Sequence, residues 1–532
     1  MGDSMAQQQS LISALQRAEA YPHAVDEIEH IETHISHLLL AGAFVYKIKK
    51  PLDLGFLDFS TLERRRYFCE EELRLNRRLA PELYLDLVTI TGDHDTPEID
   101  GKGEILEYAV RMRRFPQSSL FDRTLPDREL VLRLARRVAR FHAVIPAVDP
   151  RESYGQPQSV LQPMLENFAH IRAALDERAG NGKLASLETW TRKRMERLLP
   201  VIRQRREQGH IRECHGDMHL GNIARFQGRI CIFDGIEFNP QLRWIDTQSD
   251  MAFLLMDLQH KGLQQEAASF LNAYLEISGD YDGLPLLPFY LVYRAMVRAK
   301  VTAIRLAQSG LSRDERRSTA AEYAAHIDLA ARLSQVMPPA LIITFGFSGS
   351  GKSRVAGWLA EHLPAIQVRS DVERKRLCGL LTGESLVSAP DEGIYRPEVT
   401  EATYTRLHAI ATTAIQAGFT TIIDATFLDA GARDRFRKLA QTQGCPFLIL
   451  ACHAPVGLLR ERVQQRNREE SDPSDADLTV LERQLKKSQA FSVAEQPFLL
   501  EWDTTEAPSS ALLEQISAKL NLQRCECAET RE

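Results

Sequence analysis

The chain has 532 residues, which suits two to four domains of roughly 100–200 residues each. Hydrophobic residues make up 44% and charged residues 26%, the balance of an ordinary globular protein. The formal net charge of −6 disfavours a protein that mainly coats nucleic acid, because such proteins carry a basic surplus. No apolar run reaches the ~18–20 residues of a membrane span, and the N-terminus lacks a signal-peptide core, so we expect a cytoplasmic protein without a membrane partner. The eight cysteines show neither a zinc-ligand spacing nor a disulfide framework.

Strand-like and helical patterns divide the first part of the chain. Residues 25–115 contain short strand-like runs, whereas residues 127–206 carry apolar side chains at the three- and four-residue spacing of helices. A strand-and-loop segment at 215–234 precedes further helices. The order predicts a small sheet-containing lobe followed by a larger helical lobe over residues 25–335, after an N-terminal extension at 1–24.

Strand alternation and an acidic helix provide a lysine of the kind that binds nucleotide phosphates in kinases and a glutamate of the kind that pairs with that lysine. Lys47 and Lys49 share one face of a predicted strand. We favour Lys47, because Val45 two residues earlier can cover the adenine. The helix that follows offers Glu72 as the favoured partner and Glu71 as the alternative. Taken alone, the same residues also suit a surface lysine and a solvated acidic run.

The loop at residues 215–222 reads His-Gly-Asp-Met-His-Leu-Gly-Asn. The spacing from Asp217 to Asn222 is that of a protein-kinase catalytic loop, where the Asp orients the acceptor hydroxyl and the Asn holds Mg²⁺. The strand at 229–233 ends in Asp234, whose carboxylate can coordinate the same metal. The alternative is a turn with structural acids, but the matched spacing favours a magnesium site.

A domain boundary follows the helices of the first part. Pro338 and Pro339 must end the preceding helix, because proline cannot continue one. The apolar run at 340–345 is typical of a buried parallel strand. We therefore expect a second domain at 339–520 and a charged tail at 521–532.

The second domain opens with Gly-Phe-Ser-Gly-Ser-Gly-Lys-Ser, which matches the P-loop pattern in full. Its glycines allow backbone N–H groups to converge on phosphate oxygens, and the helix that follows adds a favourable dipole. Lys352 can reach the β- and γ-phosphates, and the Ser353 hydroxyl can ligate Mg²⁺. The loop therefore predicts a site for ATP with Mg²⁺, with GTP left open. The nucleotide-binding residues predicted in it are Gly346, Ser348, Gly349, Ser350, Gly351, Lys352 and Ser353.

Two charged residues follow the next predicted strand, where side chains reach the edge of the sheet beside the phosphates. Asp371 can accept a proton from an acceptor hydroxyl, and Arg374 can steady a phosphate. A helix N-cap aspartate followed by a surface arginine explains the spacing equally well.

An acid and two arginines complete the predicted phosphate site. The strand at 420–424 ends in Asp424, where a magnesium-binding acid is expected. Arg462 and Arg466 lie four residues apart on one helix face and can form a lid over the transferring phosphate. The alternative for each arginine is a solvated charged helix.

Four motifs of the second domain resemble the small P-loop kinases, a group that includes polynucleotide kinase, zeta toxin and gluconate kinase. They are the loop at 346–353, the Arg-Ser-Asp-x-x-Arg segment at 369–374, the Ile-Ile-Asp-Ala-Thr strand at 422–426 and the arginine-rich helix before residues 472–476. The resemblance covers residues 340–520. It implies a kinase reaction in which Asp371 and Arg374 activate the acceptor hydroxyl, as in polynucleotide kinases, without indicating the substrate.

The first domain resembles kinases of the aminoglycoside phosphotransferase and choline kinase type over residues 25–330, most specifically in its His-Gly-Asp-x-His-x-Gly-Asn loop. The resemblance implies a two-lobed kinase that phosphorylates a hydroxyl of a small molecule. Asp217 would be its base, Asn222 and Asp234 its metal ligands, and Asp250 a structural acid.

Two departures accompany this resemblance. No Gly-x-Gly-x-x-Gly loop precedes Lys47, and residues 33–37 stand in its place, as in some members of the class. The Phe of the protein-kinase Asp-Phe-Gly is replaced by Gly235. The whole chain resembles the bacterial bifunctional aminoglycoside phosphotransferase/ATP-binding proteins.

These patterns predict an α+β two-lobed protein-kinase-like domain followed by an α/β P-loop domain with a parallel sheet flanked by helices. Each domain is expected to transfer the γ-phosphoryl of ATP to a hydroxyl of a small molecule, with a nucleic-acid 5′ end as the less favoured acceptor. In the alternative, one half is an inactive or regulatory nucleotide-binding domain, and the P-loop half acts as an NTPase switch. The sequence leaves the acceptors and the oligomeric state open.

Overall fold

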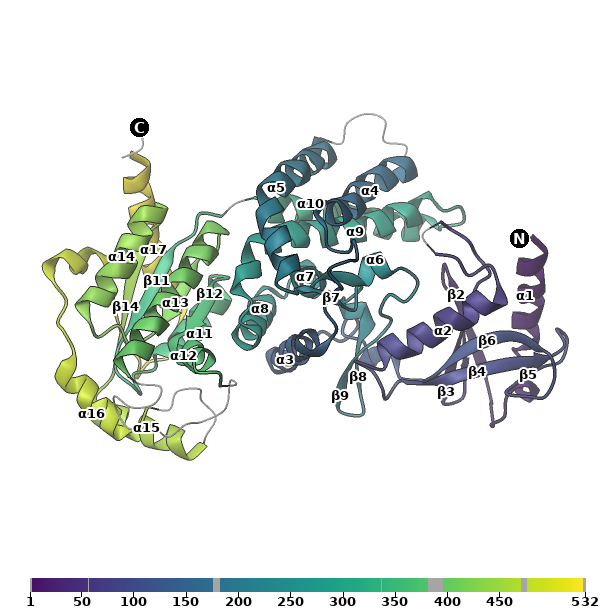
Figure 1. Ribbon diagram of the computed structural model, residues 1–532, viewed down its shortest axis with the longest axis horizontal. Coiled ribbons are helices and arrows are strands. Elements are labelled where there is room, and N and C mark those ends of the chain that lie inside the picture. The colour runs from purple at the N-terminus through teal and green to yellow at the C-terminus, as the bar shows by residue number, and fades with distance from the viewer. Residues whose placement is uncertain are drawn as a thin grey trace. The chain divides into compact units, whose positions relative to one another are not determined.

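The computed structural model describes residues 2–55, 57–175, 182–335, 337–380, 396–469 and 476–529. Residues 472–475, part of one predicted motif, lie outside this set. The chain forms two compact units, and Figure 1 shows their helices and strands. The first comprises Met1–Asp127, Phe141–Ala169 and Ile202–Asp257, and the second comprises Arg128–Arg140, His170–Val201 and Leu258–Glu532. Among the helices that the structure describes, none is long and apolar enough to cross a membrane.

A six-stranded antiparallel sheet forms the core of the first unit, in the order β1-β2-β3-β6-β4-β5. Its strands are β1 (Ile28–Glu32), β2 (Ser36–Ala41), β3 (Phe44–Lys49), β4 (Tyr84–Gly92), β5 (Pro97–Ile99) and β6 (Ile105–Arg113). Because successive side chains alternate along β3, Tyr46 and Ile48 point to one face of the sheet and Lys47 and Lys49 to the other.

Helices cover both faces of this sheet. They are α1 (Gly2–Ala14), followed by the short η1 (Ala18–Ala20), and α2 (Leu62–Asn76). Leu11 and Ile12 of α1 are buried against Tyr46 on one face, whereas Cys69 of α2 packs with Tyr84 on the other. The hydroxyl of Thr61 caps α2 by accepting from the backbone N–H of Arg64 at 3.2 Å, so the helix begins directly after it. The lysine-bearing face of β3 therefore looks toward α2.

The rest of the first unit contains the strand-and-loop segment expected at 215–234. Its elements are η2 (Gln117–Ser119), β7 (Ile211–Glu213), η3 (Leu220–Asn222), β8 (Ile223–Phe226), β9 (Arg229–Ile232), α6 (Pro240–Arg243), β10 (Trp244–Asp246) and α7 (Thr247–His260). In the β8–β9 hairpin Ile223 pairs with Ile232, and Phe233 N donates to Asn222 O at 2.9 Å. The hairpin thus brings the residues at 222 and 234 to the same end.

Helices form before and after the strand-and-loop segment, where the apolar spacing predicts them. They are α3 (Arg128–Val144), α4 (Pro157–Leu175), α5 (Gly182–Glu207), α8 (Gln264–Ser278), η4 (Tyr281–Leu286), α9 (Leu287–Ala307) and α10 (Arg313–Leu333). Ser312 caps α10 in a reciprocal box with Glu315, and the helix ends at Leu333, before Pro338 and Pro339, as expected.

A five-stranded parallel sheet lies at the centre of the P-loop domain, in the order β12-β13-β11-β14-β15. Its strands are β11 (Leu341–Phe345), β12 (Ile366–Arg369), β13 (Thr421–Asp424), β14 (Phe447–His453) and β15 (Leu499–Asp503). The helices are α11 (Lys352–His362), α12 (Ser370–Leu377), α13 (Pro397–Gln416), α14 (Ala430–Gln443), α15 (Val456–Glu469), α16 (Leu478–Lys487), η6 (Val493–Phe498) and α17 (Ser510–Glu529). Val355 of α11 and Leu512 of α17 share one apolar cluster with Ile342 and Leu448. The predicted parallel sheet flanked by helices is confirmed.

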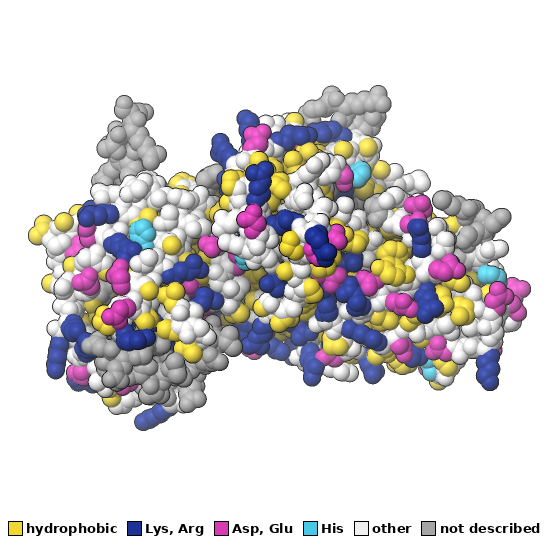
Figure 2. Space-filling view, viewed as in Figure 1, with side chains coloured by type: hydrophobic (Ala, Val, Ile, Leu, Met, Phe, Trp, Pro, Cys, Tyr) yellow, Lys and Arg dark blue, Asp and Glu magenta, His cyan; other side chains and the backbone are white. Residues whose placement is uncertain are grey.

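Charged side chains of both signs are interspersed on the face of the molecule drawn in Figure 2. Among the exposed charged residues of the helices, some form pairs one helical turn apart, such as Arg66 with Glu70 at 2.9 Å and Lys438 with Asp434 at 2.8 Å. Such exposed pairs are worth little stability, and they describe a well-solvated surface.

Candidate active sites

The loop at 215–222 folds tightly around Asp217. Gly216 has φ +87, and a Cβ built there would lie 2.7 Å from Leu242 O, so no other residue fits. Asn222 Nδ2 donates at 3.0 Å to both the backbone oxygen and Oδ2 of Asp217. His219 Nε2 lies 3.5 Å from Asp217 Oδ2. The loop thus holds the Asp217 carboxylate in one place while about a third of its side chain stays exposed.

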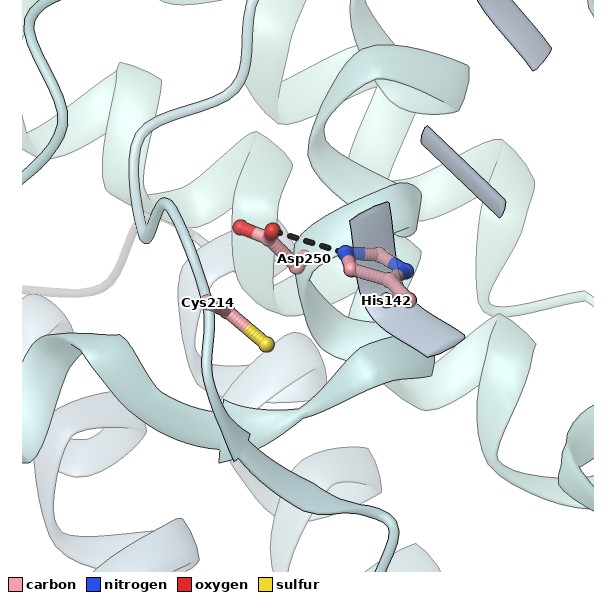
Figure 3. A group of neighbouring side chains, drawn as sticks. All are labelled: His142, Cys214 and Asp250. Atoms are coloured by element: carbon pink, nitrogen blue, oxygen red, sulfur yellow. Dashed lines mark hydrogen bonds and ion pairs between the residues drawn. The ribbon is translucent and has the colours of Figure 1, made fainter. Parts of the chain in front are cut away.

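The carboxylate of Asp250, at the start of α7, anchors the loop at 215–222 through hydrogen bonds. This carboxylate accepts from His215 N at 3.1 Å and Gly216 N at 2.8 Å, and it contacts His142 Nε2 at 3.0 Å (Figure 3). Cys214 completes a buried group whose ligand atoms are close enough for a metal ion. Because backbone N–H groups already occupy both Asp250 oxygens, the geometry is that of a hydrogen-bonded support for the loop.

Lys47, Glu72 and Asp234 form a chain of ion pairs. Lys47 Nζ lies 2.8 Å from Glu72 Oε1 and 2.5 Å from Asp234 Oδ1. Burial by itself lowers the pKa of Lys47, but Asp234 and Glu72 outweigh it and raise the pKa well above its usual value. Burial raises the pKa of Glu72, and the two lysines beside it reverse that shift and lower it. The alternative partner, Glu71, pairs instead with Arg74 at 2.8 Å.

The backbone around Asp234 is anchored to α2 and β4. Asp234 has φ +61, a left-handed conformation that costs free energy in most residues. Its N–H donates to the Tyr84 hydroxyl at 3.1 Å, and Gly235 N donates to Asn76 Oδ1 at 2.8 Å. These bonds turn the Asp234 side chain toward Lys47, and 47% of it is exposed.

The oxygens near this loop suit a hard divalent cation. The Asn222 amide nitrogen is held by Asp217, which leaves its oxygen as the atom for a metal. The β8–β9 hairpin brings Asp234 to the same end as Asn222, so the Asp234 carboxylate can bind the same ion. Carboxylate and amide oxygens are the ligands Mg²⁺ prefers, so the residues present fit that ion.

The P-loop of the second domain follows β11 and leads into α11. Gly349 has φ +80, and a Cβ there would lie 2.6 Å from Leu459 O. Gly351 is the N-cap of α11. Lys352 Nζ donates to Phe347 O at 2.8 Å, across the loop. The loop therefore curls around the lysine with its backbone in the conformations that only glycines adopt readily.

A cavity of about 870 Å³ opens over this loop. Lys352, Asp371 and Asp424 line it together, although they come from different segments of the chain. The other predicted residues on its wall are Ser348, Gly349, Gly351, Ser353, Arg374, Arg462 and Arg466. Gly346 and Ser350 lie behind this wall, where Ser350 is fully buried.

Asp424 ends β13 beside the P-loop. Burial raises its pKa, partly offset by Arg369 and Lys352. Burial likewise lowers the pKa of Lys352, against the pull of Asp424. Gln367 Nε2 donates to Asp424 Oδ2 at 3.2 Å, and the Ser353 hydroxyl bonds the same carboxylate. The Ser353 hydroxyl and the Asp424 carboxylate therefore lie together beside the P-loop, and both offer oxygens that could bind Mg²⁺.

Asp371 and Arg374 lie on the first turns of α12. The N-cap of that helix is Arg369, so Asp371 does not cap it. Arg374 is only 7% exposed and donates to the Thr400 hydroxyl at 3.0 Å, so it is not a surface arginine. The helix-cap alternative of the sequence is therefore wrong, and both residues face the cavity.

The two lid arginines on α15 differ in their contacts. Arg462 bridges the P-loop and β15, with Nη1 at 3.3 Å from Gly349 O and Nη2 at 2.9 Å from Thr504 O. Arg466 donates to Ala476 O at 2.5 Å. Neither has the contacts of a fully solvated side chain.

Some residues of the two sites were not found from the sequence. Gln484 Oε1 accepts from Ser348 N at 2.8 Å, and Thr504 Oγ1 accepts from Arg462 at 3.1 Å. Lys49 and Glu237 join the ion-pair chain of the first site. The alternation of β3 placed Lys49 on the right face, but nothing local pointed to Gln484, Thr504 or Glu237.

Comparison with known proteins agrees with both folds. Residues 61–287 match the phosphotransferase enzyme family, and residues 341–491 match an AAA domain family. Amicoumacin kinase in complex with AMP-PNP, Ca²⁺ and amicoumacin is 15% identical with a TM-score of 0.39, covering 62% of this chain and 96% of that one. A gluconokinase from Sinorhizobium meliloti 1021 is 19% identical with a TM-score of 0.24, covering 37% of this chain and 97% of that one.

The uncharacterized protein Rv2004c of Mycobacterium tuberculosis (strain ATCC 25618 / H37Rv) is 30% identical over 462 residues. The match covers 85% of this chain and 89% of the relative, so it extends across both domains. The chain therefore belongs to the family of this mycobacterial protein, and it is an ATP-dependent phosphotransferase that joins a kinase-like domain to a P-loop domain.

Proposed function

We propose that the chain carries two separately active phosphotransferase sites, each moving the γ-phosphoryl of ATP to a hydroxyl of a small molecule. Catalysis at both sites rests on positioning and charge neutralisation, because little covalent chemistry is left to the protein in phosphoryl transfer.

In the first site Asp217 is the base that orients the acceptor hydroxyl. Asn222 and Asp234 hold Mg²⁺, which would neutralise charge on the phosphates when bound. Lys47, held by Glu72 at 2.8 Å, binds the nucleotide phosphates. Support comes from the hydrogen bonds that fix Asp217 and Asn222 to each other.

In the second site the P-loop and Lys352 bind the phosphates, and Ser353 and Asp424 hold Mg²⁺. Asp371 is the base for the acceptor, Arg374 steadies the reacting end of the acceptor, and Arg462 and Arg466 close over the nucleotide. All four residues line the cavity. The common place of these residues on the wall of one cavity supports the proposed roles.

One observation carries the kinase proposal for the second half over an NTPase switch. The cavity continues past the P-loop to Thr400, Tyr404 and Arg435 on α13 and α14. A switch that only hydrolyses nucleotide needs no such space, whereas an acceptor does. Over the whole wall basic side chains outnumber acidic ones, as the phosphates of a nucleotide require, whereas Glu401 and Asp429 add acids to the part on α13 and at the start of α14. These two acids favour a small polar acceptor over a nucleic-acid strand.

Labelling of a metabolite extract with ATP radiolabelled at the γ-phosphate tests the proposal. Wild type, Asp217→Ala, Lys352→Ala and the double variant are compared. Each single variant should lose a different set of labelled products, and the double variant should lose all of them. Asp149→Ala is the control, because the Asp149 side chain is exposed and pairs with the exposed Arg151.

The other outcomes separate the rivals. If neither single variant loses a product, the two-site proposal fails. If Lys352→Ala loses ATP hydrolysis but no product, the P-loop half is an NTPase switch. Labelling of an added 5′-hydroxyl oligonucleotide that disappears in Lys352→Ala would make the acceptor a nucleic-acid end.

A further inference from the structure

A second lysine extends the ion-pair chain of the first site. Lys49 Nζ lies 2.7 Å from Glu72 Oε2, and it also donates to Glu237 Oε1. Glu72 is therefore shared, because its other oxygen faces Lys47 at 2.8 Å. The cluster consists of two ammonium groups and three carboxylates, which run in the order Asp234, Lys47, Glu72, Lys49, Glu237.

Burial divides this cluster into an open and a closed end. The side chains of Lys49 and Glu72 are 0% exposed and that of Glu237 is 4% exposed. At the other end, Lys47 is 11% and Asp234 is 47% exposed. A nucleotide and its metal can reach the open end. The closed end is buried inside the protein, where the Phe59 ring lies 5.0 Å from Lys49 Nζ.

The closed end ties together three segments that are distant in sequence. Lys49 lies on β3, Glu72 lies on α2, and Glu237 lies three residues after Asp234 in the loop that follows β9. Arg243 Nη1 donates to Glu237 O at 2.9 Å, so the loop is held on its backbone as well. The ammonium of Lys49 is thus the point where the strand, the helix and the acid-bearing loop meet.

Burying such charges is unfavourable for stability, since apolar side chains of similar size usually serve a core at least as well. A buried ion pair is better explained by the arrangement that it specifies. Here that arrangement is the place of Asp234 relative to Lys47. When Lys47 moves from Asp234 to bind a phosphate, Glu72 could lose its cation. Lys49, bound to the second oxygen of Glu72, keeps that carboxylate paired.

We propose that Lys49 and Glu237 are positioning residues of the first phosphoryl-transfer site, which hold Glu72 and the Asp234 loop in place while Lys47 binds the nucleotide. The proposal rests on the proposed function of that site. It assigns Lys47 and Lys49, on the same face of one strand, to different tasks. Lys47 contacts the nucleotide, and Lys49 acts through Glu72 and Glu237.

The test uses the full chain with Lys352→Ala throughout, so that only the first site binds nucleotide. Lys49→Met, Glu237→Gln and the double variant Lys49→Met/Glu237→Met are added to it. Binding of Mn²⁺ together with a non-hydrolysable ATP analogue is followed by electron paramagnetic resonance, and thermal unfolding is recorded alongside. Arg111→Met is the matched control, because Arg111 pairs with Asp86 at 2.5 Å on the same sheet and lies opposite Tyr46, on the face away from Lys47 and Lys49.

Both single variants should weaken Mn²⁺ binding in the complex roughly 10- to 100-fold, the range seen when the supports of metal ligands are lost. Arg111→Met should leave Mn²⁺ binding unchanged. The double variant should recover thermal stability, because no unpaired charge stays buried, but it should not recover Mn²⁺ affinity.

Two results would overturn the inference. One is wild-type Mn²⁺ affinity in the folded double variant, which would reduce the pair to a replaceable core contact. The other is an equal loss of Mn²⁺ affinity in Arg111→Met. If instead the Lys352→Ala parent binds no Mn²⁺ and analogue at all, the proposed function of the first site fails, and this outcome is distinguishable from both.

Discussion

The two sites, as proposed, use different parts of the chain to bind phosphate. The first draws single side chains from β3, α2, the loop at 215–222 and the end of β9, and it joins them by ion pairs and hydrogen bonds. The second draws on one continuous loop and the N-terminus of the helix after it, and the side chains around it are added from the strand ends. The first site depends on charge and tertiary packing, and the second on backbone conformation.

The difference implies different weaknesses. A charge removed from the first site leaves its partner buried and unpaired, which affects both stability and function. A Cβ added to the second site blocks the close approach of the backbone to its neighbours. Substitutions of the two kinds should therefore separate the sites.

The largest effect is expected from the two acids proposed to hold the metal, where the two sites should behave alike. Asp234→Asn and Asp424→Asn each remove a carboxylate charge with little change of shape, and Asn tolerates the φ +61 of position 234. Each should slow formation of its own set of labelled products by about 100-fold or more, as loss of a transition-state charge contact does. The measurement is the initial rate of product labelling over a Mg²⁺ titration. If one variant slowed both sets equally, the sites would not be independent.

The parts of the two sites that could be predicted from the sequence differ for the same reason. The P-loop could be identified in one continuous pattern, because its function is encoded in neighbouring residues. The loop carrying Asp217 and Asn222 was also local. The pairing of Lys47 with Glu72 had to be chosen among consecutive glutamates, since the sequence did not give the rotation of α2 relative to β3.

Contacts that close over a long stretch of chain were out of reach. Gln484 binds the P-loop across 136 residues of sequence, and Glu237 binds Lys49 across 188. No periodicity links such positions. The helix-cap interpretation of Asp371 failed for a related reason, because only the packing of α12 against α13 buries Arg374.

A glycine pair isolates the backbone dependence of the second site. Gly349→Ala places a Cβ 2.6 Å from Leu459 O, whereas Gly310, with φ +99, has open space around it. Both alanines carry a conformational cost of about 1 kcal/mol, but only Gly349→Ala should also weaken binding of an ATP analogue to the P-loop, by roughly tenfold. The affinity is measured with Lys47→Ala present to silence the first site. Equal affinities in the two variants would show that the close approach does not matter.

The acids of the two sites should respond to pH with opposite sign. The pKa of Glu72 is lowered from 4.5 to about 2, so its contribution to stability is present above about pH 4.5 and is lost as the pH falls toward 2. Glu72→Gln should destabilise the first unit by about 3 kcal/mol at neutral pH, and the gap should close in acid. Burial raises the pKa of Asp424, so its charged form opposes folding at neutral pH, and Asp424→Asn should stabilise its domain there.

Hydrogen exchange in Mg²⁺-free buffer can read these stabilities separately, at β3 and α2 for Glu72 and at β11 and β13 for Asp424. The wild type at the same pH is the reference for each variant. Stabilisation by Glu72→Gln, or destabilisation by Asp424→Asn at neutral pH, would contradict the assignment of charge states.

The smallest expected effect comes from α1, which supports the first site from the far face of its sheet. Gln8 Nε2 donates to Lys49 O at 2.8 Å and to Glu107 Oε2 at 3.1 Å, while Arg65 of α2 binds the same carboxylate at 2.8 Å. Gln8→Ala should lower the stability of the first unit by about 1 kcal/mol, the usual worth of such bonds. Gln9→Ala on the exposed side of α1 is the control and should have no effect. Gln8 contacts β3 through the backbone oxygen of Lys49 and not through the charged Lys49 side chain. Nucleotide affinity at the first site should therefore fall by less than with Lys49→Met. A larger loss would mean that α1 sets the position of β3, and that the first site depends on backbone as well as on charge.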